Sequence, residues 1–335
     1  MHTFQALMVS KTDQDFSVKM KTLTKEDLPR SDVFIKVAYS SVNYKDGLAS
    51  TPNGKIIQKY PLIPGIDLTG IVESSDDPRF QKGDKVIATS YDIGVAHHGG
   101  YSEYACIPAD WVVKLPEELT LREAAILGTA GLTAALSISK LEEHGVQPDH
   151  GEILVTGATG GVGSLAVDML TNKGYRVTAS TGKAEQHDYL KKLGAESVIP
   201  REEVYNGSLK PLKQQRWAGV IDPVGGSVLA SVLSQLQYGG VAAVSGLTAG
   251  TDLPATVFPF ILRGVSLVGI DSVFCPMNIR EPMWRRMATD LKPAHLEEIV
   301  AQEVRLEQLP EQLSTILDGH ITGRILVAVG ETEIK

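Results

Sequence analysis

The sequence has little cysteine, no excess of basic residues and no long apolar run. Among its 335 residues, the two cysteines are Cys106 and Cys275, so at most one disulfide and no cysteine-rich zinc lobe can form. We therefore expect a reducing, cytoplasmic location, with both cysteines packed as small apolar side chains. With 32 basic and 40 acidic residues the formal net charge is −8, which argues against binding to nucleic acid.

Signals for membrane targeting are also missing. The N-terminus lacks a charged start followed by an apolar run and a small-residue cleavage site, so we expect no signal peptide. The most apolar segment, 127–138, contains glycine and threonine and is too short to span a bilayer, so we expect no membrane segment. The 43% hydrophobic and 21% charged residues are typical of a folded enzyme, and the length favours two domains.

The residue pattern changes near residue 121, which predicts an α/β protein built from two different domains. Before this point, short apolar runs separated by Gly, Pro and Asp predict strands over 33–37, 66–72, 85–89 and 101–107. After it, helices over 162–172 and 184–193 alternate with strands over 153–155, 175–179, 197–199, 218–221, 241–245 and 265–270. This alternation predicts a doubly wound parallel sheet. A helix over 309–317 and a strand over 324–329 are expected to return to the first, β-rich domain.

A glycine-rich turn follows the strand over 153–155 and opens directly into a helix. Glycines let the backbone approach a pyrophosphate, and a helix N-terminus supplies free N–H groups and a positive dipole. Aligned on its last glycine, the turn reads Ala158-x-Gly160-x-x-Gly163, so alanine replaces the first glycine of the usual fingerprint. We expect Gly160, Gly161, Val162 and Gly163 to bind a dinucleotide.

Two other nucleotide-binding motifs do not fit this turn. A triphosphate-binding P-loop closes with Gly-Lys-Ser/Thr, whereas Gly163 is followed by Ser164 and Leu165. A short-chain dehydrogenase needs a Tyr-x-x-x-Lys pair, and none of the ten tyrosines has lysine four residues later.

The end of the strand over 175–179 indicates which dinucleotide binds. An NAD site favours an acidic residue about 20 residues after the turn, where it holds the ribose hydroxyls. Here the sequence reads Ser180-Thr181-Gly182-Lys183, and these hydroxyls and this cation suit the 2′-phosphate of NADPH. Arg201, after the next strand, adds a second cation, whereas the nearby Glu185 is an objection. The alternative is an ordinary solvated polar turn.

Nine segments spread over nearly the whole chain carry further information. They are Asn43-Tyr44-Lys45-Asp46, the segments 61–70, 83–86, 99–105 and 128–134, the glycine turn 157–163, Asp222-Pro-Val-Gly-Gly226, the segment 259–264 and Gly323-Arg324. In these segments and their order, the chain resembles the zinc-free medium-chain dehydrogenase/reductases, and in particular their acrylyl-CoA reductase and quinone oxidoreductase-like branch.

The resemblance implies a GroES-like β-rich catalytic domain and a Rossmann domain that binds NADP. On this basis we expect residues 1–125 and 300–335 to form the first domain and residues 126–299 the second. Members of this branch are usually homodimers that pair near the edge strand corresponding to residues 265–270. We therefore expect a homodimer.

The resemblance also implies that zinc is absent. Zinc-dependent relatives carry a cysteine where Asn43–Asp46 stands here, and Gly-His-Glu where Gly65-Ile66-Asp67 stands. Without such a Lewis acid, an alcohol dehydrogenase mechanism cannot polarise its oxygen. His97 and His98 are adjacent, point apart in an extended chain and have no third ligand at a suitable spacing, so we expect no metal there.

The remaining chemistry is hydride transfer from the nicotinamide to an electron-poor double bond or a quinone. The matching tyrosine of the family lies beside the nicotinamide, so we expect Tyr44 to be catalytic and to contact the cofactor; the alternative is a packed, structural tyrosine. Asn43 either fixes its loop or contacts the substrate, and both interpretations stay open. By family position Leu247 and Ile270 border the nicotinamide, and Arg324 reaches the cofactor or is a surface cation.

Three functions stay open at this point. The first is reduction of a short enoyl thioester such as acrylyl-CoA, and the second is reduction of a quinone or small enone. The third, from a different class, is a non-catalytic NADPH-binding protein like the crystallin-type relatives that keep the fold. Sequence alone does not locate the cationic mouth that a CoA ester needs.

Overall fold

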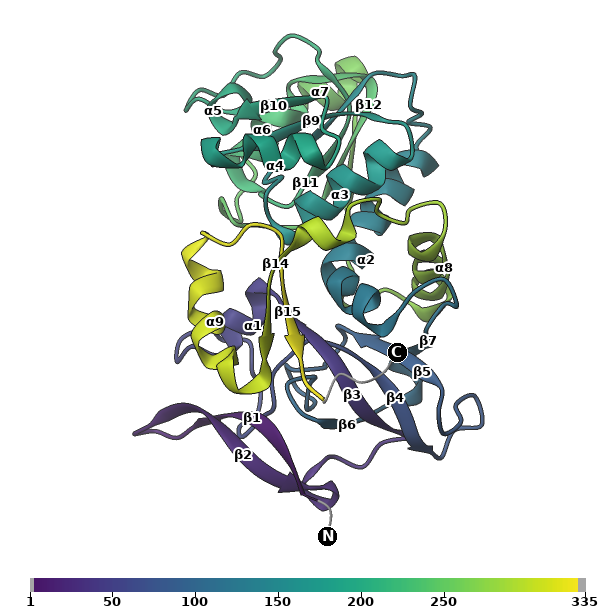
Figure 1. Ribbon diagram of the computed structural model, residues 1–335. Coiled ribbons are helices and arrows are strands. Elements are labelled where there is room, and N and C mark those ends of the chain that lie inside the picture. The colour runs from purple at the N-terminus through teal and green to yellow at the C-terminus, as the bar shows by residue number, and fades with distance from the viewer. Residues whose placement is uncertain (1–2, 331–335) are drawn as a thin grey trace. The chain divides into compact units, whose positions relative to one another are not determined.

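The computed structural model describes residues 3–330, which divide into two compact units (Figure 1). Residues 3–129, 273–282 and 300–330 form the first unit, and residues 130–272 and 283–299 form the second. The sequence pattern does not predict that residues 273–282 belong to the first unit.

The first unit is rich in antiparallel strands. Two of them form a hairpin, and the others form a sheet in the order β14-β15-β3-β4-β5-β7, with β6 paired to β3. The strands are β1 (Thr3–Lys11), β2 (Phe16–Thr24), β3 (Val33–Val42), β4 (Asp67–Ser75), β5 (Lys85–Thr89), β6 (Tyr104–Ile107), β7 (Val112–Lys114), β14 (Val300–Arg305) and β15 (Arg324–Ala328). The helices are α1 (Tyr44–Ala49) and α9 (Leu309–Thr315), and the 3-10 turns are η1 (Lys25–Asp27), η2 (Ala109–Trp111), η5 (Leu306–Gln308) and η6 (Ile316–Asp318).

Strand β3 organises this unit because three other strands pair with it. Its residues Val33, Ile35 and Val37 are buried, as alternation along a half-buried strand requires. Strand β15 runs antiparallel to β3, with Ile325 opposite Val42. The strand predicted over 324–329 therefore belongs to the first unit, as expected.

The segment 273–282 is held in the first unit by Arg280, whose side chain is fully buried. The guanidinium donates to the carbonyl oxygens of Thr89 and Val273 at 3.0 Å each, and its Cζ lies 4.3 Å from the centre of the Tyr91 ring. The Tyr91 hydroxyl donates to the carbonyl oxygen of Cys275 at 3.0 Å. A buried cation is tolerated only where its donors are satisfied, so these contacts fix the segment.

The second unit contains a parallel sheet of six strands in the order β10-β9-β8-β11-β12-β13. The strands are β8 (Glu152–Val155), β9 (Arg176–Thr181), β10 (Ser197–Pro200), β11 (Trp217–Asp222), β12 (Leu236–Val244) and β13 (Ser266–Gly269). The chain winds outward from β8 to β10 and then returns to β11 beside β8. The predicted doubly wound sheet is confirmed, and its topological switch point lies between β8 and β11.

Helices cover both faces of this sheet because right-handed crossovers place successive connections on opposite sides of the switch point. They are α3 (Gly161–Asn172), α4 (His187–Lys192), α5 (Arg201–Val204), α6 (Gly226–Leu233) and α7 (Phe258–Arg263), with the 3-10 turn η3 (Ala184–Gln186). Helix α8 (Met277–Ala288) begins in the first unit and ends in the second, and the 3-10 turn η4 (Leu296–Ile299) follows it. The helix predicted over 184–193 is divided into η3 and α4, and Gly194 ends it with a φ of +96°. Val204 and Leu229 pack with Trp217 in the core on one face.

Helix α2 (Leu121–Glu143) continues from the first unit into the second and is broken at Gly128, whose φ and ψ are 48° and −152°. By length and composition alone this helix could cross a membrane. Buried positions account for 83% of its most apolar window, which is also typical of a core helix, so the evidence for a membrane span is weak.

Candidate functional site

The glycine turn follows strand β8 and therefore lies at the switch point of the parallel sheet. Strand β8 ends at Val155, and α3 begins at Gly161 with Gly160 at its N-cap. The first N–H groups of a helix have no partner within it, so those of Gly161, Val162 and Gly163 can receive an anion. A Cβ on Gly163 would lie 2.4 Å from the carbonyl oxygen of Gly157, so this tight turn requires glycine.

The residues predicted to bind a 2′-phosphate lie together at the ends of β9 and β10. Because Thr181 pairs with Pro200, Arg201 comes next to Gly182, and a Cβ on Gly182 would lie only 3.1 Å from the Arg201 Nε. The side chains of Ser180 and Thr181 are buried.

The two cations of this group differ in their surroundings. Lys183 is partly buried, and burial lowers the pKa of its ammonium group while the charge of Glu185 opposes that shift. The side chain of Arg201 is 72% exposed and pairs with Glu202 at 3.1 Å, an ion pair that costs little to exchange for a phosphate. The group therefore offers two hydroxyls and two cations at one edge of the sheet.

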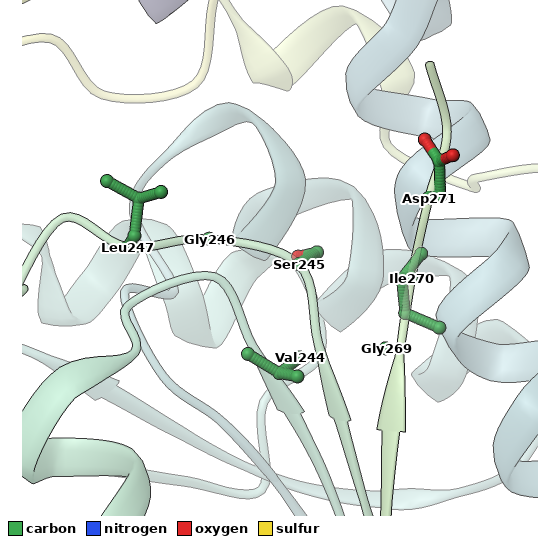
Figure 2. A pocket seen from close by; sticks show the side chains of 7 residues that line it. All are labelled: Val244, Ser245, Gly246, Leu247, Gly269, Ile270 and Asp271. Atoms are coloured by element: carbon green, nitrogen blue, oxygen red, sulfur yellow. The ribbon is translucent and has the colours of Figure 1, made fainter. Parts of the chain in front are cut away.

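A cavity of about 480 Å³ opens at the ends of β12 and β13. Figure 2 shows the segments that follow these two strands side by side, with Leu247 on one and Ile270 on the other. The cavity is lined by Val244, Ser245, Gly246, Leu247, Gly269, Ile270 and Asp271. Both residues predicted to border the nicotinamide thus line one cavity at the carboxyl edge of the sheet, where ligands bind in doubly wound folds.

In the first unit, Tyr44 is the first residue of α1 and its side chain is half exposed. The preceding residue, Asn43, does not cap the helix with its side chain. Its carboxamide instead donates to Asp67 Oδ2 at 2.8 Å and accepts from Arg324 Nη1 at 2.9 Å. Of the two interpretations that the sequence left open for Asn43, these contacts agree with the one in which it fixes its loop beside Tyr44, and contact with a substrate stays a prediction.

Asp67 is the centre of a buried polar cluster that the sequence did not reveal. Its carboxylate accepts hydrogen bonds from the hydroxyls of Ser41, at 2.7 Å, and Thr129, at 2.5 Å. The guanidinium of Arg324 lies 3.5 Å away. Asp67 follows an apolar residue at the start of a strand, where no local pattern distinguishes it from any other acidic residue.

Asp46, on α1, adds a second buried carboxyl group to this cluster. It accepts the backbone N–H groups of Asn43, at 2.8 Å, and Ile66, at 3.0 Å. Burial, and next the negative charge of Asp67, raise the pKa of Asp46 to about 7. The two carboxyl groups share one cation, Arg324, so the cluster favours keeping a proton.

Arg324 is 3% exposed and is therefore not a surface cation. Its guanidinium donates to the carbonyl oxygens of Ile126, at 3.0 Å, and Val42, at 3.4 Å, and to the Ser41 hydroxyl at 2.7 Å. Its contacts within the first unit are structural, and a role in cofactor binding stays a prediction.

The adjacent histidines are both partly buried. His98 Nδ1 accepts the N–H of Ile63 at 3.2 Å, and burial lowers its pKa to about 4. The ring of His97 packs edge-on against Trp111. Across residues 3–330, no group of three or more His, Cys, Asp and Glu side chains is placed to hold a metal ion.

A family model described as an alcohol dehydrogenase GroES-like domain matches residues 29–117, and one described as a zinc-binding dehydrogenase matches residues 161–289. The protein YhfP of Bacillus subtilis is 59% identical over 97% of this chain and 98% of its own length. It is named as a quinone oxidoreductase, an assignment that the name itself marks as provisional. Its crystal structure with NAD bound has a TM-score of 0.96 and covers 98% of this chain and all of that one.

Two other relatives are nearly as similar. Acrylyl-CoA reductase AcuI of Ruegeria pomeroyi is 48% identical over 97% of this chain and 99% of its own. The structure of Escherichia coli YhdH with bound NADPH has a TM-score of 0.93 at 46% identity, covering 97% of this chain and 100% of that one. The matches confirm the predicted fold class, a GroES-like unit with a Rossmann-type parallel sheet.

The description of the second family model mentions zinc, but the residues here do not fit such an ion. Asn43 and Asp67 lie in the two segments that the resemblance aligns with zinc ligands, and both are bonded to the guanidinium of Arg324. By the same resemblance, the apolar Ile66 takes the place of a histidine ligand. A second cation at this place would oppose the charge of Arg324.

Proposed function

The chain belongs to the medium-chain dehydrogenase/reductase family, as an oxidoreductase of its quinone oxidoreductase and acrylyl-CoA reductase branch, and from this we propose that it is a zinc-independent, NADPH-dependent reductase of short enoyl thioesters. The observation that carries the cofactor choice is the grouping of Ser180, Thr181, Lys183 and Arg201 beside the glycine turn. The similarity to AcuI over nearly the whole chain supports the choice of substrate.

In this proposal, bound NADPH supplies a hydride to the β-carbon of the substrate double bond. The thioester becomes an enolate, which is then protonated at its α-carbon. The glycine turn holds the pyrophosphate, and Lys183 and Arg201 hold the 2′-phosphate by charge-assisted hydrogen bonds. Leu247 and Ile270 border the ring, and alignment of this kind supplies much of the acceleration.

We assign Tyr44 to the reacting end. Its half-exposed phenol is available to orient the cofactor or to donate a hydrogen bond or proton as negative charge develops on the substrate. The buried cluster of Asp67, Asn43 and Arg324 holds the start of α1, and with it the backbone of Tyr44.

A second candidate function is reduction of quinones or small enones, which the similarity to YhfP favours. The test is oxidation of NADPH, followed by its absorbance, with acrylyl-CoA and a simple quinone at matched concentrations and with NADH as the control cofactor. Fast, NADPH-selective turnover of acrylyl-CoA is expected. Turnover of the quinone alone would establish the second function, and tight NADPH binding without oxidation by any acceptor would establish a non-catalytic protein.

We also propose that the protein forms a homodimer through the outer strand of the parallel sheet. Strand β13 lies at the sheet edge, where unpaired backbone groups can pair with a second chain. Beside it in sequence, Ile261 and Leu262 on α7 are 69% and 55% exposed. Light scattering should give the mass of two chains. Ile261→Glu should lower that mass to one chain, whereas Leu209→Glu, at another exposed apolar residue, should leave it unchanged.

A further inference from the structure

One buried acidic residue of the second unit has no part in the proposed function. Asp222 is the last residue of β11, and Thr156 follows the last residue of the adjacent strand β8. The two side chains therefore meet at the switch point of the sheet, directly beneath the glycine turn. Both are at most 2% exposed, and their side chains bond to each other.

The carboxylate of Asp222 joins the connections that follow two strands. Its Oδ1 accepts the hydroxyl of Thr156, and its Oδ2 accepts the N–H of Gly225 at 2.7 Å. Its backbone carbonyl oxygen accepts the N–H of Ser245 at 3.0 Å. Burial raises the pKa of this carboxyl group even though these hydrogen bonds lower it. Losing one partner would leave a buried oxygen without a hydrogen bond, which is unfavourable.

The turn 223–226 that follows Asp222 is packed between two other loops. On one side, a Cβ on Gly157 would lie 3.0 Å from Val224 Cγ2, so the glycine turn rests against Val224. On the other side, the carbonyl oxygen of Val224 accepts the N–H of Ala249 at 2.9 Å. A Cβ on Gly246 would lie 2.0 Å from the carbonyl oxygen of Pro223, so these backbones are in direct contact.

The geometry points to Thr156 and Asp222 as positioning residues: they set the loop 245–247, which borders the nicotinamide, at a defined distance from the turn that binds the pyrophosphate. This inference rests on the proposed function, since it requires a dinucleotide that touches both loops. Hydride transfer is sensitive to such spacing, because misplacement by about 1 Å can cost 10²-fold in rate.

The glycine turn has supports of its own that do not involve Asp222. The N–H of Ala158 donates to the carbonyl oxygen of Ser180 at 3.0 Å, and the Ser164 hydroxyl donates to the carbonyl oxygen of Ala158 at 3.1 Å. Removing the Thr156 hydroxyl should therefore leave binding of the adenosine half intact and disturb the nicotinamide half. A general loss of structure would weaken both.

The experiment compares Thr156→Val, which removes the hydroxyl at constant shape, with Thr156→Ser, which keeps it. The affinity for 2′,5′-ADP reports the adenosine half, the affinity for NADPH reports both halves, and kcat reports hydride transfer. For Thr156→Val we expect kcat to fall at least about tenfold. Its affinity for 2′,5′-ADP should change less than about twofold, because the contacts that support the turn are unchanged. Thr156→Ser should behave as the wild type.

Three results would overturn the inference: equal loss of affinity for both ligands at unchanged kcat, no change in any quantity, or failure of Thr156→Ser to restore kcat. If Thr156→Val does not fold, Asp222→Asn replaces it, because this change keeps the side-chain volume. Asp222→Asn should likewise lower kcat and leave the affinity for 2′,5′-ADP nearly unchanged. If none of the acceptors tested supports oxidation of NADPH by the wild type, the proposed function fails. The affinities alone then test the inference, because Thr156→Val must weaken NADPH and spare 2′,5′-ADP.

Discussion

The buried carboxyl group of Asp46 should make the protein less stable as the pH rises from 3.8 to about 7. The group is fully buried, and its pKa is raised from 3.8 to about 7 by burial and by the charge of Asp67. The folded state therefore binds this proton more tightly than the unfolded state does. The stabilisation is fully present below pH 3.8, falls by about 1.4 kcal/mol per pH unit above it, and is lost once the pH exceeds 7.

The structure sets the size of this effect. A difference of about three pKa units corresponds to about 4 kcal/mol over the whole range, of which roughly 2.5 kcal/mol is lost between pH 5 and pH 8. Asp46→Asn removes the titration, so its free energy of unfolding should lack this decline. A constant offset is also expected, because the Asn43 and Ile66 N–H groups donate to different oxygens of Asp46, and in asparagine an NH2 donor replaces one of them.

The assay is urea unfolding of the wild type and Asp46→Asn at several pH values from 5 to 8. The difference in the free energy of unfolding between the two should shrink with rising pH. Asp27→Asn is the matched control, since hydrogen bonds from Thr24 lower the pKa of this exposed carboxyl group and move its titration below the range measured. Parallel curves for the wild type and Asp46→Asn would refute the reasoning.

Three further predictions concern the two units. Gly128→Ala would place a Cβ 2.4 Å from Asp67 Oδ2. Disrupting that buried ion pair should cost roughly 3–5 kcal/mol of stability in thermal or urea unfolding, whereas Gly174→Ala, with a φ of +89° and open space around it, should cost only about 1–2 kcal/mol. Lys183→Glu should weaken binding of NADPH at least about tenfold relative to NADH, because it removes a charge-assisted hydrogen bond to the 2′-phosphate. Tyr44→Phe should lower kcat roughly 10²-fold while leaving the affinity for NADPH nearly unchanged.

Each of these has a result that would contradict it. Equal losses for the two alanine variants would mean that the ion pair does not depend on Gly128. An unchanged ratio of NADPH to NADH affinity in Lys183→Glu, measured by titration calorimetry, would remove the 2′-phosphate assignment. Full turnover by Tyr44→Phe in the NADPH oxidation assay would make the tyrosine structural.

Much of the candidate cofactor site was predictable because its signals are local. A strand, a glycine turn and a helix within some twenty residues determine where an anion can bind, whatever the rest of the chain does. The hydroxyls and the lysine of 180–183 follow the next strand directly. In a parallel sheet that position faces the same edge as the turn, so the structure places Arg201 beside Gly182.

The polar cluster around Asp67 could not be predicted in the same way. The sequence left open whether Asn43 fixes its loop or contacts the substrate, and in the structure its carboxamide lies between Asp67 and a guanidinium 281 residues away in the sequence. The assignment of residues 273–282 to the first unit depends likewise on Arg280, whose partner Thr89 is 191 residues away. Nothing in the neighbouring residues indicates either contact.

The amino-acid sequence by itself determined the strands, the glycine turn and the chemistry that follows β9, since each depends on backbone preferences and side chains close together in the chain. Only the tertiary structure decided which charges are buried and what satisfies them. Sheet register brings Ser41 and Thr129 to Asp67, and strand β15 brings Arg324. A buried polar group needs a hydrogen-bond partner, and that partner can lie far away in the sequence. The residues next to a buried group therefore do not indicate which partner it has.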